Sequence, residues 1–521
     1  MRYHQGRLLG HGHRRVRDLA RSRRFYKVVH SLPALPLGLL LLLQVFAANA
    51  GEILIENVTV VTPDLEQPLL HRHVLIRDTR IAGISAEPIA AEPDVKRIDG
   101  RGKFLTPGIM DSHVHVTDPP GVPPGGDDPV LAALREAFAR QQPRSYLYFG
   151  VTQILDPANL PQGIAAFEAQ PLHPDVFRCG AAPVLDGYPT VFVPQPARYD
   201  AIPDYIFEPH NADRHPLPAG ADAAAHTPEA VVRRIAAAGA HCVKVFVEDG
   251  FGDASNWPIL SMESLRKIRA ATREYGLPLV AHANALGMQQ IALAADVDVI
   301  AHGLWNWDAL AGEPGVPAEI ASHLRKVHER KTGFQPTIRV LPGMADLFRH
   351  DTLEDPVYRK VVPAALLEWY ASDAGRWFKD ELRLDFGDET DTQVAHIYVK
   401  IAAQGMRAAK FLHDLGHPLL LGSDTPSAPT YGNQPGYDTY REMRFMAQSG
   451  IPLAAIFRAA TINNARQFKL DKDYGTVAEG KIANLLLLEA NPLETVRAWS
   501  LIDKVLLRGK VIERETLGAD R

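Results

Sequence analysis

Eight short apolar runs, separated by helical stretches, constrain the fold of this chain more than any other feature of its sequence. Strands that alternate with helices form parallel βα units with right-handed crossovers. Eight such units predict an α/β fold, a (β/α)8 barrel of the TIM type, which commonly spans about 250 residues or more as one domain. The runs are Phe104 to Val116, Val151 to Leu155, Val176 to Val184, Cys242 to Val247, Leu277 to Ala281, Val297 to Ala301, Gly333 to Ile338 and Pro418 to Gly422.

The stretches on either side of these runs have the pattern of short strands. Residues 53–61 and 73–76 near the start, and residues 483–489 and 505–512 near the end, are apolar runs broken by turn residues. That pattern is typical of strands and hairpins. Neither stretch is large enough to bury a core alone. We therefore predict that residues 51–106 and 471–521 combine into one small β-sandwich domain, with the barrel at residues 107–470.

The first 50 residues have the three-part pattern of a secretory signal peptide. Nine Lys or Arg residues are followed by an apolar run, Leu37 to Phe46, and by Ala48-Asn49-Ala50. The apolar run has about ten residues, whereas a membrane-spanning helix needs about 20. We predict cleavage near Ala50, export to the periplasm or the extracellular space, and no stable membrane insertion afterwards. Because Ser22-Arg23-Arg24-Phe25 matches a twin-arginine signal only in part, the export route stays open.

Charge and cysteine content exclude other classes of protein. Of the 56 basic and 61 acidic residues in the chain, residues 51–521 hold 47 and 60, so the predicted mature protein is acidic and unsuited to sequence-independent nucleic-acid binding. We expect a small-molecule substrate, and a homo-oligomer stays open. Two cysteines, Cys179 and Cys242, cannot build a disulfide framework. We interpret both as buried small apolar residues, with a single bridge between them as the alternative.

Two intervals between the predicted strands are too long for ordinary loops. Residues 185–227, rich in Pro and aromatic residues, follow the third run, and residues 340–395, rich in Trp, Tyr and charged residues, follow the seventh. Long insertions in compact domains usually serve as lids or as walls of a binding site. A surface or dimer-contact subdomain is the alternative for both.

Polar residues end several of the apolar runs, and in barrels of this type the chemistry lies at the carboxyl ends of the strands. The first run ends in Asp111-Ser112-His113-Val114-His115. Side chains alternate faces along a strand, so His113 and His115 point the same way, as two ligands of one metal must. The motif on its own is short and arises often by chance.

Later runs add four more residues of the same kind, and these make the metal interpretation specific. Four imidazoles, one lysine and one carboxylate form a ligand set suited to Zn²⁺ or a similar divalent metal. A lysine between valines is costly to bury unless it is paired or neutralised, and carboxylation of its amine by CO₂ would make it an anionic bridge between two cations. The four further residues are Lys244, His282, His302 and Asp424.

This ligand set resembles that of the amidohydrolase superfamily, most closely its prolidase-like and imidazolonepropionase-like branch. The resemblance covers residues 52–521. It includes Leu105-Thr106-Pro107-Gly108-Ile109-Met110-Asp111-Ser112-His113-Val114-His115, Gly150-Val151-Thr152, Ala459-Ala460-Thr461-Ile462-Asn463-Asn464-Ala465 and Gly475-Thr476-Val477-Ala478-Glu479-Gly480-Lys481-Ile482-Ala483-Asn484-Leu485.

The resemblance implies two divalent metal ions, expected to be Zn²⁺. It implies that His113, His115 and Asp424 hold the more buried ion. It further implies that His282 and His302 hold the second ion, and that carboxylated Lys244 bridges the two.

Three features depart from the family pattern. Asn484 stands where relatives usually have Asp, and Gln153-Ile154-Leu155-Asp156 stands where relatives more often have Thr-Val-Arg-Asp. The 122 residues from His302 to Asp424 also exceed the expected spacing. None of the three removes a predicted ligand, but the long spacing weakens any transfer of substrate identity.

The predicted site indicates a metal-dependent hydrolase. Water shared by two divalent ions has its pKa lowered toward about 7 and can attack a carbonyl at neutral pH. Asp424 would accept the proton of that water and return it to the leaving nitrogen. The expected substrate is an N-acyl amino acid, a dipeptide or a cyclic amide, and the bond cleaved is its amide-type C–N bond. An esterase or lactonase with the same site, and a non-catalytic binding barrel, are the alternatives.

The sequence also offers candidates for residues that select the substrate. A free substrate carboxylate would need an Arg or Lys on a barrel loop, and Arg198, Arg214 and Arg339 lie in predicted loops. Tyr188 and Tyr199 are candidates for contacts with a carbonyl or a ring. An ordinary surface position is the alternative for all five.

Overall fold

The computed structural model describes residues 52–519 except for 118, 126–127, 196 and 252–255. The predicted signal peptide, residues 1–50, lies outside the described residues. Among the helices of the described chain, none is long and apolar enough to cross a membrane.

Seven strands form one fully parallel sheet, and they follow one another in chain order across it. Each strand pairs only with the strands before and after it, as successive right-handed βα units require. The strands are β6 (Ile109–Asp111), β7 (Val151–Asp156), β8 (Asp175–Ala181), β9 (Cys242–Phe246), β10 (Leu279–His282), β11 (Val299–Ala301) and β12 (Gly333–Gln335). Seven of the eight apolar runs therefore contain a strand of this sheet.

The eighth run, Pro418 to Gly422, is not a regular strand, so the prediction of eight strands is wrong at this position. Pro418 lacks a backbone N–H, and Asp424 has a left-handed backbone with φ 55°, so no continuous ladder forms. The segment nevertheless bonds to both edges of the sheet. The Leu420 N–H donates to the Phe334 carbonyl at 3.0 Å, and the Leu421 carbonyl accepts from the Ser112 N–H at 3.0 Å.

The first run, Phe104 to Val116, is divided between two sheets. Residues Phe104–Pro107 form β5 of the second sheet, and the barrel strand β6 begins only at Ile109. Gly108 lies at the crossing, where a Cβ atom would lie 1.8 Å from the Thr152 hydroxyl oxygen. The close approach of β7 thus requires glycine at this position and ends the first strand early.

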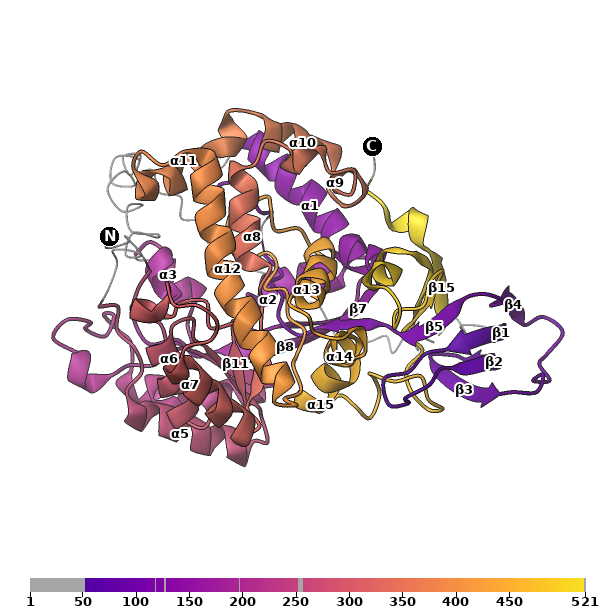
Figure 1. Cartoon of the computed structure of the whole chain (residues 1–521). Helices are drawn as coiled ribbons and strands as arrows, with labels where there is room; N and C mark the ends of the chain where they lie inside the picture. Colours follow the sequence, from indigo (N-terminus) through magenta and orange to yellow (C-terminus); the bar gives the residue numbers. More distant parts are fainter. Residues whose placement is uncertain (1–51, 118, 126–127, 196, 252–255, 520–521) are drawn as a thin grey trace, which may run out of the picture.

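Strands from both ends of the described chain form one mixed sheet. Its order is β15-β14-β13-β5-β1-β2-β3, with β4 paired to β1, and β5 and β13 join the two halves as antiparallel neighbours. The terminal strands are β1 (Ile53–Val60), β2 (Leu69–Arg77), β3 (Arg80–Ser85), β4 (Lys96–Asp99), β13 (Leu485–Leu488), β14 (Ile502–Leu507) and β15 (Lys510–Glu513). In Figure 1, β1 to β4 extend from one side of the molecule and β5 leads back to its body. The predicted sandwich is, by its strand pairing, a single continuous sheet.

Helices cover the parallel sheet, and several begin at a polar side chain that caps the first turn. Thr227 caps α4 (Pro228–Ala237), Ser261 caps α5 (Met262–Glu274), and Thr390 with Gln393 forms a capping box at α12 (Asp391–Asp414). The other long helices between the strands are α1 (Pro129–Tyr148), α2 (Pro161–Glu168), α6 (Leu286–Ala294) and α7 (Ala318–Glu329). Their buried apolar faces and those of the strands form one continuous core.

The two predicted insertions differ in structure. Residues 185–227 hold only short helical turns, including α3 (Ala197–Ala201), whereas residues 340–395 form α8 (Val340–Ala345), α9 (Tyr358–Val361), α10 (Ala364–Ala371) and α11 (Trp377–Arg383). In Figure 1, α9 and α10 lie beside α1. The Trp369 and Trp377 indoles both donate to the Gly121 carbonyl in the loop after β6. The second insertion is therefore fastened to that loop.

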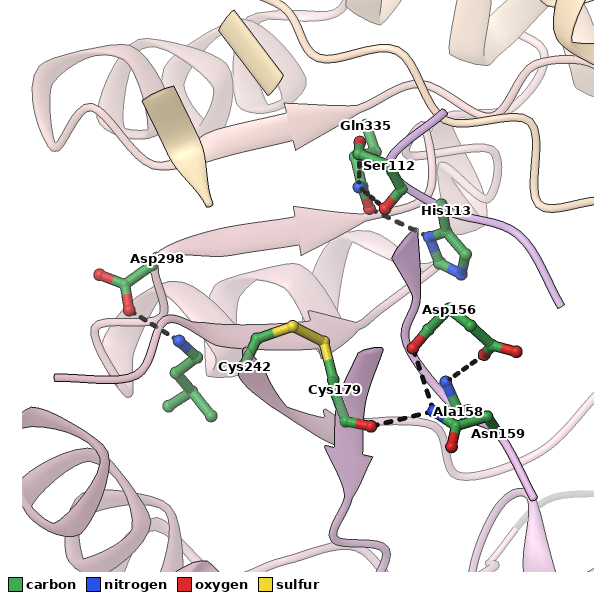
Figure 2. Close-up of a disulfide and its surroundings, with 10 residues drawn as sticks. Ser112, His113, Asp156, Ala158, Asn159, Cys179, Cys242, Asp298 and Gln335 are labelled. Atoms are coloured by element: carbon green, nitrogen blue, oxygen red, sulfur yellow. Dashed lines mark hydrogen bonds between the residues drawn. A yellow bond between two sulfur atoms is a disulfide. The ribbon is translucent and has the colours of Figure 1, made fainter. Parts of the chain in front are cut away.

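Cys179 and Cys242 form a disulfide between the paired strands β8 and β9 (Figure 2). Their Cα atoms lie 4.3 Å apart, and both residues are buried among apolar side chains that include Met110, Leu155 and Val280. The interpretation as two unpaired apolar residues is wrong, and the bridge that the sequence left open is present. Lys244 follows Cys242 by two residues, so both side chains lie on the same face of β9.

Asn484 joins the mixed sheet to the barrel and explains one departure from the family pattern. Its amide nitrogen donates to the Asp175 carboxylate at 2.8 Å, and its carbonyl oxygen accepts from the Arg508 N–H at 2.7 Å. The Tyr474 hydroxyl donates to the same carboxylate at 2.8 Å. Asp175 also pairs with the Arg508 guanidinium, and an aspartate at position 484 would add a second carboxylate in place of the donor that Asn484 provides, so the neutral amide is the residue that fits.

Replacing Asn484 by Asp tests this account. We expect Asn484→Asp to lower the stability of the folded protein by about 2 kcal/mol at neutral pH, because a buried hydrogen bond becomes a contact between two carboxylates. The measurement is the melting temperature. The double variant Asp175→Asn with Asn484→Asp restores one donor opposite one carboxylate and should recover part of the loss. A single variant that melts like the wild type would contradict the account.

Candidate functional site

All six predicted site residues come together at the carboxyl ends of the parallel strands. His113 and His115 follow β6, Lys244 lies within β9, and His282 is the last residue of β10. His302 follows β11 directly, and Asp424 follows the irregular eighth run. All of them except His115 are buried.

The carboxylate of Asp424 lies at the centre of the group. Its Oδ1 atom is 3.3 Å from Nε2 of His113 and 3.0 Å from Nε2 of His115. Its Oδ2 atom is 3.5 Å from Nδ1 of His302. Ligand atoms of His113, His302 and Asp424 all lie within 4.8 Å of one another, which is close enough for one ion to contact all three.

His282 lies beside His302, and Lys244 is buried next to the histidines. The ring centroids of His282 and His302 are 4.4 Å apart, and those of His113 and His302 are 5.1 Å apart. Lys244 is 1% exposed, and its amine has no hydrogen-bond partner in the described chain. A buried amine without a partner is costly, so the site accommodates a group that the polypeptide alone does not provide.

Two members of the group have a strained backbone. His302 has φ 81° and Asp424 has φ 55°, both in the left-handed region that side chains with a Cβ atom rarely adopt. Each such residue costs on the order of 1–3 kcal/mol and persists only where its surroundings hold it. The Asp424 N–H donates to the His113 carbonyl at 2.7 Å. This hydrogen bond holds the Asp424 carboxylate beside His113 and His115.

Polar side chains from neighbouring strands orient the histidines. Nδ1 of His113 is 3.0 Å from Oε1 of Gln335, whose amide nitrogen donates to the Ser112 carbonyl (Figure 2). Nδ1 of His302 is 3.2 Å from the Thr337 hydroxyl. Such contacts set ring orientation and tautomer, and they leave Nε2 of His113 directed at Asp424.

Asp156 and Glu248 are two further acidic residues of the site, and the sequence analysis missed both as functional candidates. Asp156 lies 3.6 Å from Nδ1 of His115, and Oε2 of Glu248 lies 3.2 Å from Nε2 of His282. The Asn284 amide donates to the same Glu248 oxygen at 3.1 Å. Asp156 ends β7 and Glu248 follows β9 by two residues, so inspection of strand ends could have found them.

Burial keeps three of the histidines neutral. The pKa values of His113, His282 and His302 lie well below the usual range, first because of burial, and then because of nearby cationic groups such as Lys244. Neutral imidazole is the form that binds a metal.

The pKa values of Lys244, His115 and Glu248 are shifted in different directions. Burial lowers the pKa of Lys244 to about 7, although Asp424 and Asp156 oppose the shift. Burial also lowers the pKa of His115, but the Asp156 and Asp424 carboxylates, as hydrogen-bond acceptors for its ring, outweigh burial and raise the pKa to about 10. Burial raises the pKa of Glu248 to about 8.

The residues present fit a divalent metal. Neutral imidazoles, a carboxylate with both oxygens directed into the group and an unpartnered amine match the ligand types of zinc sites. The hydrogen-bonded outer groups match the second layer that such sites require.

The three arginines predicted to bind a substrate carboxylate are not at the site. Arg198 pairs with Asp186 at 2.5 Å within its own loop. Arg339 is fully buried between Asp346 and Asp438. Arg214 is exposed. Arg198 and Arg339 are therefore committed to carboxylates of their own surroundings, and Arg214 has the ordinary surface position that the sequence left open.

The two predicted tyrosines have different surroundings. The Tyr188 ring lies over His282, with the ring centroids 4.5 Å apart. The Tyr199 hydroxyl instead donates to Asp186 at 3.0 Å, and the residue helps to fasten the loop that carries Tyr188. Only Tyr188 therefore reaches the site.

Comparisons with known proteins agree with this geometry. The model of the amidohydrolase family matches residues 104–512. The chain is similar to an L-hydantoinase of Paenarthrobacter aurescens, 33% identical over 67 residues, and to an imidazolonepropionase of Klebsiella pneumoniae, 44% identical over 63 residues. These matches cover 13% and 12% of this chain and only 14% and 15% of the relatives.

Similar solved structures extend over most of the chain. A Xaa-Pro dipeptidase with bound methionine superposes with a TM-score of 0.64 at 18% identity, covering 89% of this chain and 100% of that one. Molinate hydrolase superposes with a TM-score of 0.62 at 19% identity, covering 90% and 96%. Ochratoxinase of A. niger superposes with a TM-score of 0.59 at 19% identity, covering 89% and 96%. At these identities the likeness shows the fold.

Metal removal and return test the site directly. We expect chelator-treated protein to bind added Zn²⁺ and to melt at a higher temperature with it, since a ligand at 100 times its Kd stabilises the folded state by about 2.7 kcal/mol. His302→Ala should lose at least one bound ion by elemental analysis. The matched control is His417→Ala, which removes a buried histidine outside the group. Equal metal content in the two variants would exclude His302 as a ligand.

Proposed function

Because the chain belongs to the amidohydrolase family, we propose that it is a metal-dependent hydrolase of an amide-type C–N bond. The observation that carries the proposal is the convergence of four histidines, one lysine and one aspartate at the strand ends around a central carboxylate. The names of the similar proteins include a hydantoinase, a dipeptidase and molinate hydrolase, which supports hydrolysis as the reaction class.

We propose two divalent ions, expected to be Zn²⁺, with the ligands divided as the resemblance implies. His113, His115 and Asp424 would hold the more buried ion, and His282 with His302 would hold the second. The division is supported by the orientation of Asp424, whose Oδ1 faces the first two histidines and whose Oδ2 faces His302.

Lys244 is proposed to bridge the two ions as a carboxylated lysine. Its amine attacks CO₂, a C–N bond forms, and one proton is released to give an anionic carbamate. Two features of Lys244 support this step: its amine has no partner, and its pKa of about 7 leaves much of it neutral and nucleophilic at physiological pH. The carbamate on Lys244 would carry a negative charge at a buried position where the positive charge of the free amine is disfavoured.

The proposed reaction uses the chain's own residues for proton transfer. Bound divalent ions supply Lewis acidity toward the scissile carbonyl and lower the pKa of water. Asp424 accepts a proton from the attacking water and delivers it to the leaving nitrogen, so that an amine and a carboxylic acid result. The His113 carbonyl, which accepts from the Asp424 N–H, holds Asp424 in place during both transfers.

The proton transfer predicts a separation of metal content from rate. Asp424→Asn keeps an oxygen ligand and the shape of the side chain but removes the base. We expect metal to be largely retained while the hydrolysis rate falls by a factor on the order of 10² to 10⁴, the usual range for general acid–base assistance. The measurement is kcat on the best substrate from a screen of N-acyl amino acids, dipeptides, cyclic amides, esters and lactones.

The matched control is Asp175→Asn, a buried carboxylate at the amino end of β8, opposite the site. It should retain the wild-type rate at temperatures where it is folded. A wild-type rate in Asp424→Asn would remove Asp424 as the proton acceptor. Hydrolysis of esters alone would replace the C–N bond by an ester as the target, and no turnover by the metal-loaded protein would favour a binding function.

We also propose that the protein is exported. The Cys179–Cys242 disulfide supports this, because disulfides persist in oxidising compartments and are rare in the cytosol. Protein isolated from its source cells should begin at Gly51 or within a few residues by N-terminal sequencing. Intact Met1 in a soluble cytoplasmic fraction would contradict export.

A further inference from the structure

Five aromatic side chains form a cluster beside the proposed metal site. We call this group the ring cluster, and Tyr188 is at its centre. The ring cluster joins the loop after β8 to the end of β9 and the loop that follows it. Its members are Tyr188, Phe192, Phe246, Phe251 and Trp257.

The rings of the cluster pack around Tyr188 at contact distances. The ring centroid of Tyr188 lies 5.8 Å from Phe192, 5.7 Å from Phe246 and 5.3 Å from Phe251, in edge-to-face arrangements. Trp257 is nearly parallel to Tyr188, with 9° between the planes. These are the geometries that aromatic pairs prefer. The aromatic ring of a ligand could make the same kind of contact with the rings of the cluster.

The ring cluster extends from the site to the surface. Phe246 is buried and lies two residues after Lys244, Tyr188 contacts His282, and Phe192 is 53% exposed. Phe192 thus marks the end of the ring cluster that faces solvent. A substrate that reaches His282 from the side of Phe192 would therefore contact aromatic side chains.

Contacts within the two loops hold the ring cluster in place independently of any metal. Arg198 binds Asp186 and the Val193 carbonyl, and so closes the loop that carries Tyr188. Gly187 packs against the other loop so closely that a Cβ atom would lie 2.5 Å from the Pro258 carbonyl. A wall that is organised before binding favours a rigid, flat ligand.

The charges around the ring cluster disfavour an anion. Asp424 and Glu248 are the charged groups that act on the Tyr188 hydroxyl. Oε2 of Glu248 lies 3.2 Å from Nε2 of His282, and Arg198, the arginine of the loop that carries Tyr188, is already paired with Asp186. The internal residues outside the description, 118, 126–127, 196 and 252–255, contain no lysine or arginine. A substrate carboxylate beside the scissile bond would therefore face acidic side chains, while Arg198 is not free to pair with it.

We propose that the ring cluster selects neutral amides that carry a flat aromatic ring next to the scissile bond and no free carboxylate there. This inference rests on the proposed function and narrows it, because N-acyl amino acids and dipeptides become poor substrates. Trp257 and Tyr188 are the residues assigned to the aromatic ring, and their role is binding rather than proton transfer.

The test compares substrates that differ in one property. The neutral probe is 2-acetamido-5-nitrobenzamide, and its charged counterpart of equal shape is 2-acetamido-5-nitrobenzoate. Leucyl-proline is the aliphatic, carboxylate-bearing reference. We expect the zinc-loaded wild type to hydrolyse the benzamide with a kcat/KM at least about tenfold above that for the benzoate.

Variants then separate ring binding from general damage. Trp257→Leu should lower kcat/KM for the benzamide by at least about tenfold, mainly through KM, and that for leucyl-proline by less than about threefold. Tyr188→Phe keeps the ring and should keep the preference for the benzamide. The control is Tyr275→Leu, an exposed aromatic residue outside the ring cluster, which should behave as the wild type. Metal content and melting temperature are measured for each variant, since a structural role would lower all substrates together.

Three outcomes would overturn the inference. These are equal or faster hydrolysis of the benzoate, an equal loss for benzamide and leucyl-proline in Trp257→Leu, and turnover of leucyl-proline alone. In each case an amide is still hydrolysed, so the proposed function stands while the substrate class fails. If no amide in the series is hydrolysed by the metal-loaded wild type, the proposed function itself fails, and the inference fails with it.

Discussion

The buried carboxylate of Asp424 is the group on which the rest of the site depends. A charge removed from water must be paired, and this one is surrounded by imidazoles from two sides of the barrel. Nε2 of His115 lies 3.0 Å from Oδ1 of Asp424, and burial holds the pKa values of His113 and His302 well below the usual range. A cluster of neutral nitrogen donors around a carboxylate is complementary to a divalent cation, and the left-handed backbone of Asp424 places it there.

The order of strands and the meeting of polar residues at their ends were predictable because each depends on local sequence. Apolar runs of strand length that alternate with helices define parallel units, and polar residues at their ends meet at one edge of the sheet. Seven of the eight runs contain strands, and the six predicted residues lie together. The eighth run escaped the pattern because Pro418 and the turn at Asp424 break the ladder, while single hydrogen bonds still attach it to both neighbours.

Contacts between distant loops were not predictable in the same way. Arg198 and Arg339 were candidates for binding a carboxylate because of their positions in predicted loops. Each instead pairs with nearby aspartates. The local sequence does not indicate these partners. The disulfide depends on strands β8 and β9 being neighbours with Cys179 and Cys242 in register. The ring cluster likewise joins residues 58 to 69 positions apart, such as Tyr188 with Phe246 and with Trp257, so it becomes visible only once the loops are placed.

The central claim is that Lys244 becomes an anionic bridge between two divalent ions held around Asp424. A crystal structure of the protein grown with Zn²⁺ and bicarbonate, measured at the zinc absorption edge, tests it most directly. The account predicts one anomalous peak beside His113 and His115 and a second beside His282 and His302. It also predicts electron density for a carboxylate group on Nζ of Lys244. A single zinc ion beside an unmodified Lys244 amine would contradict it.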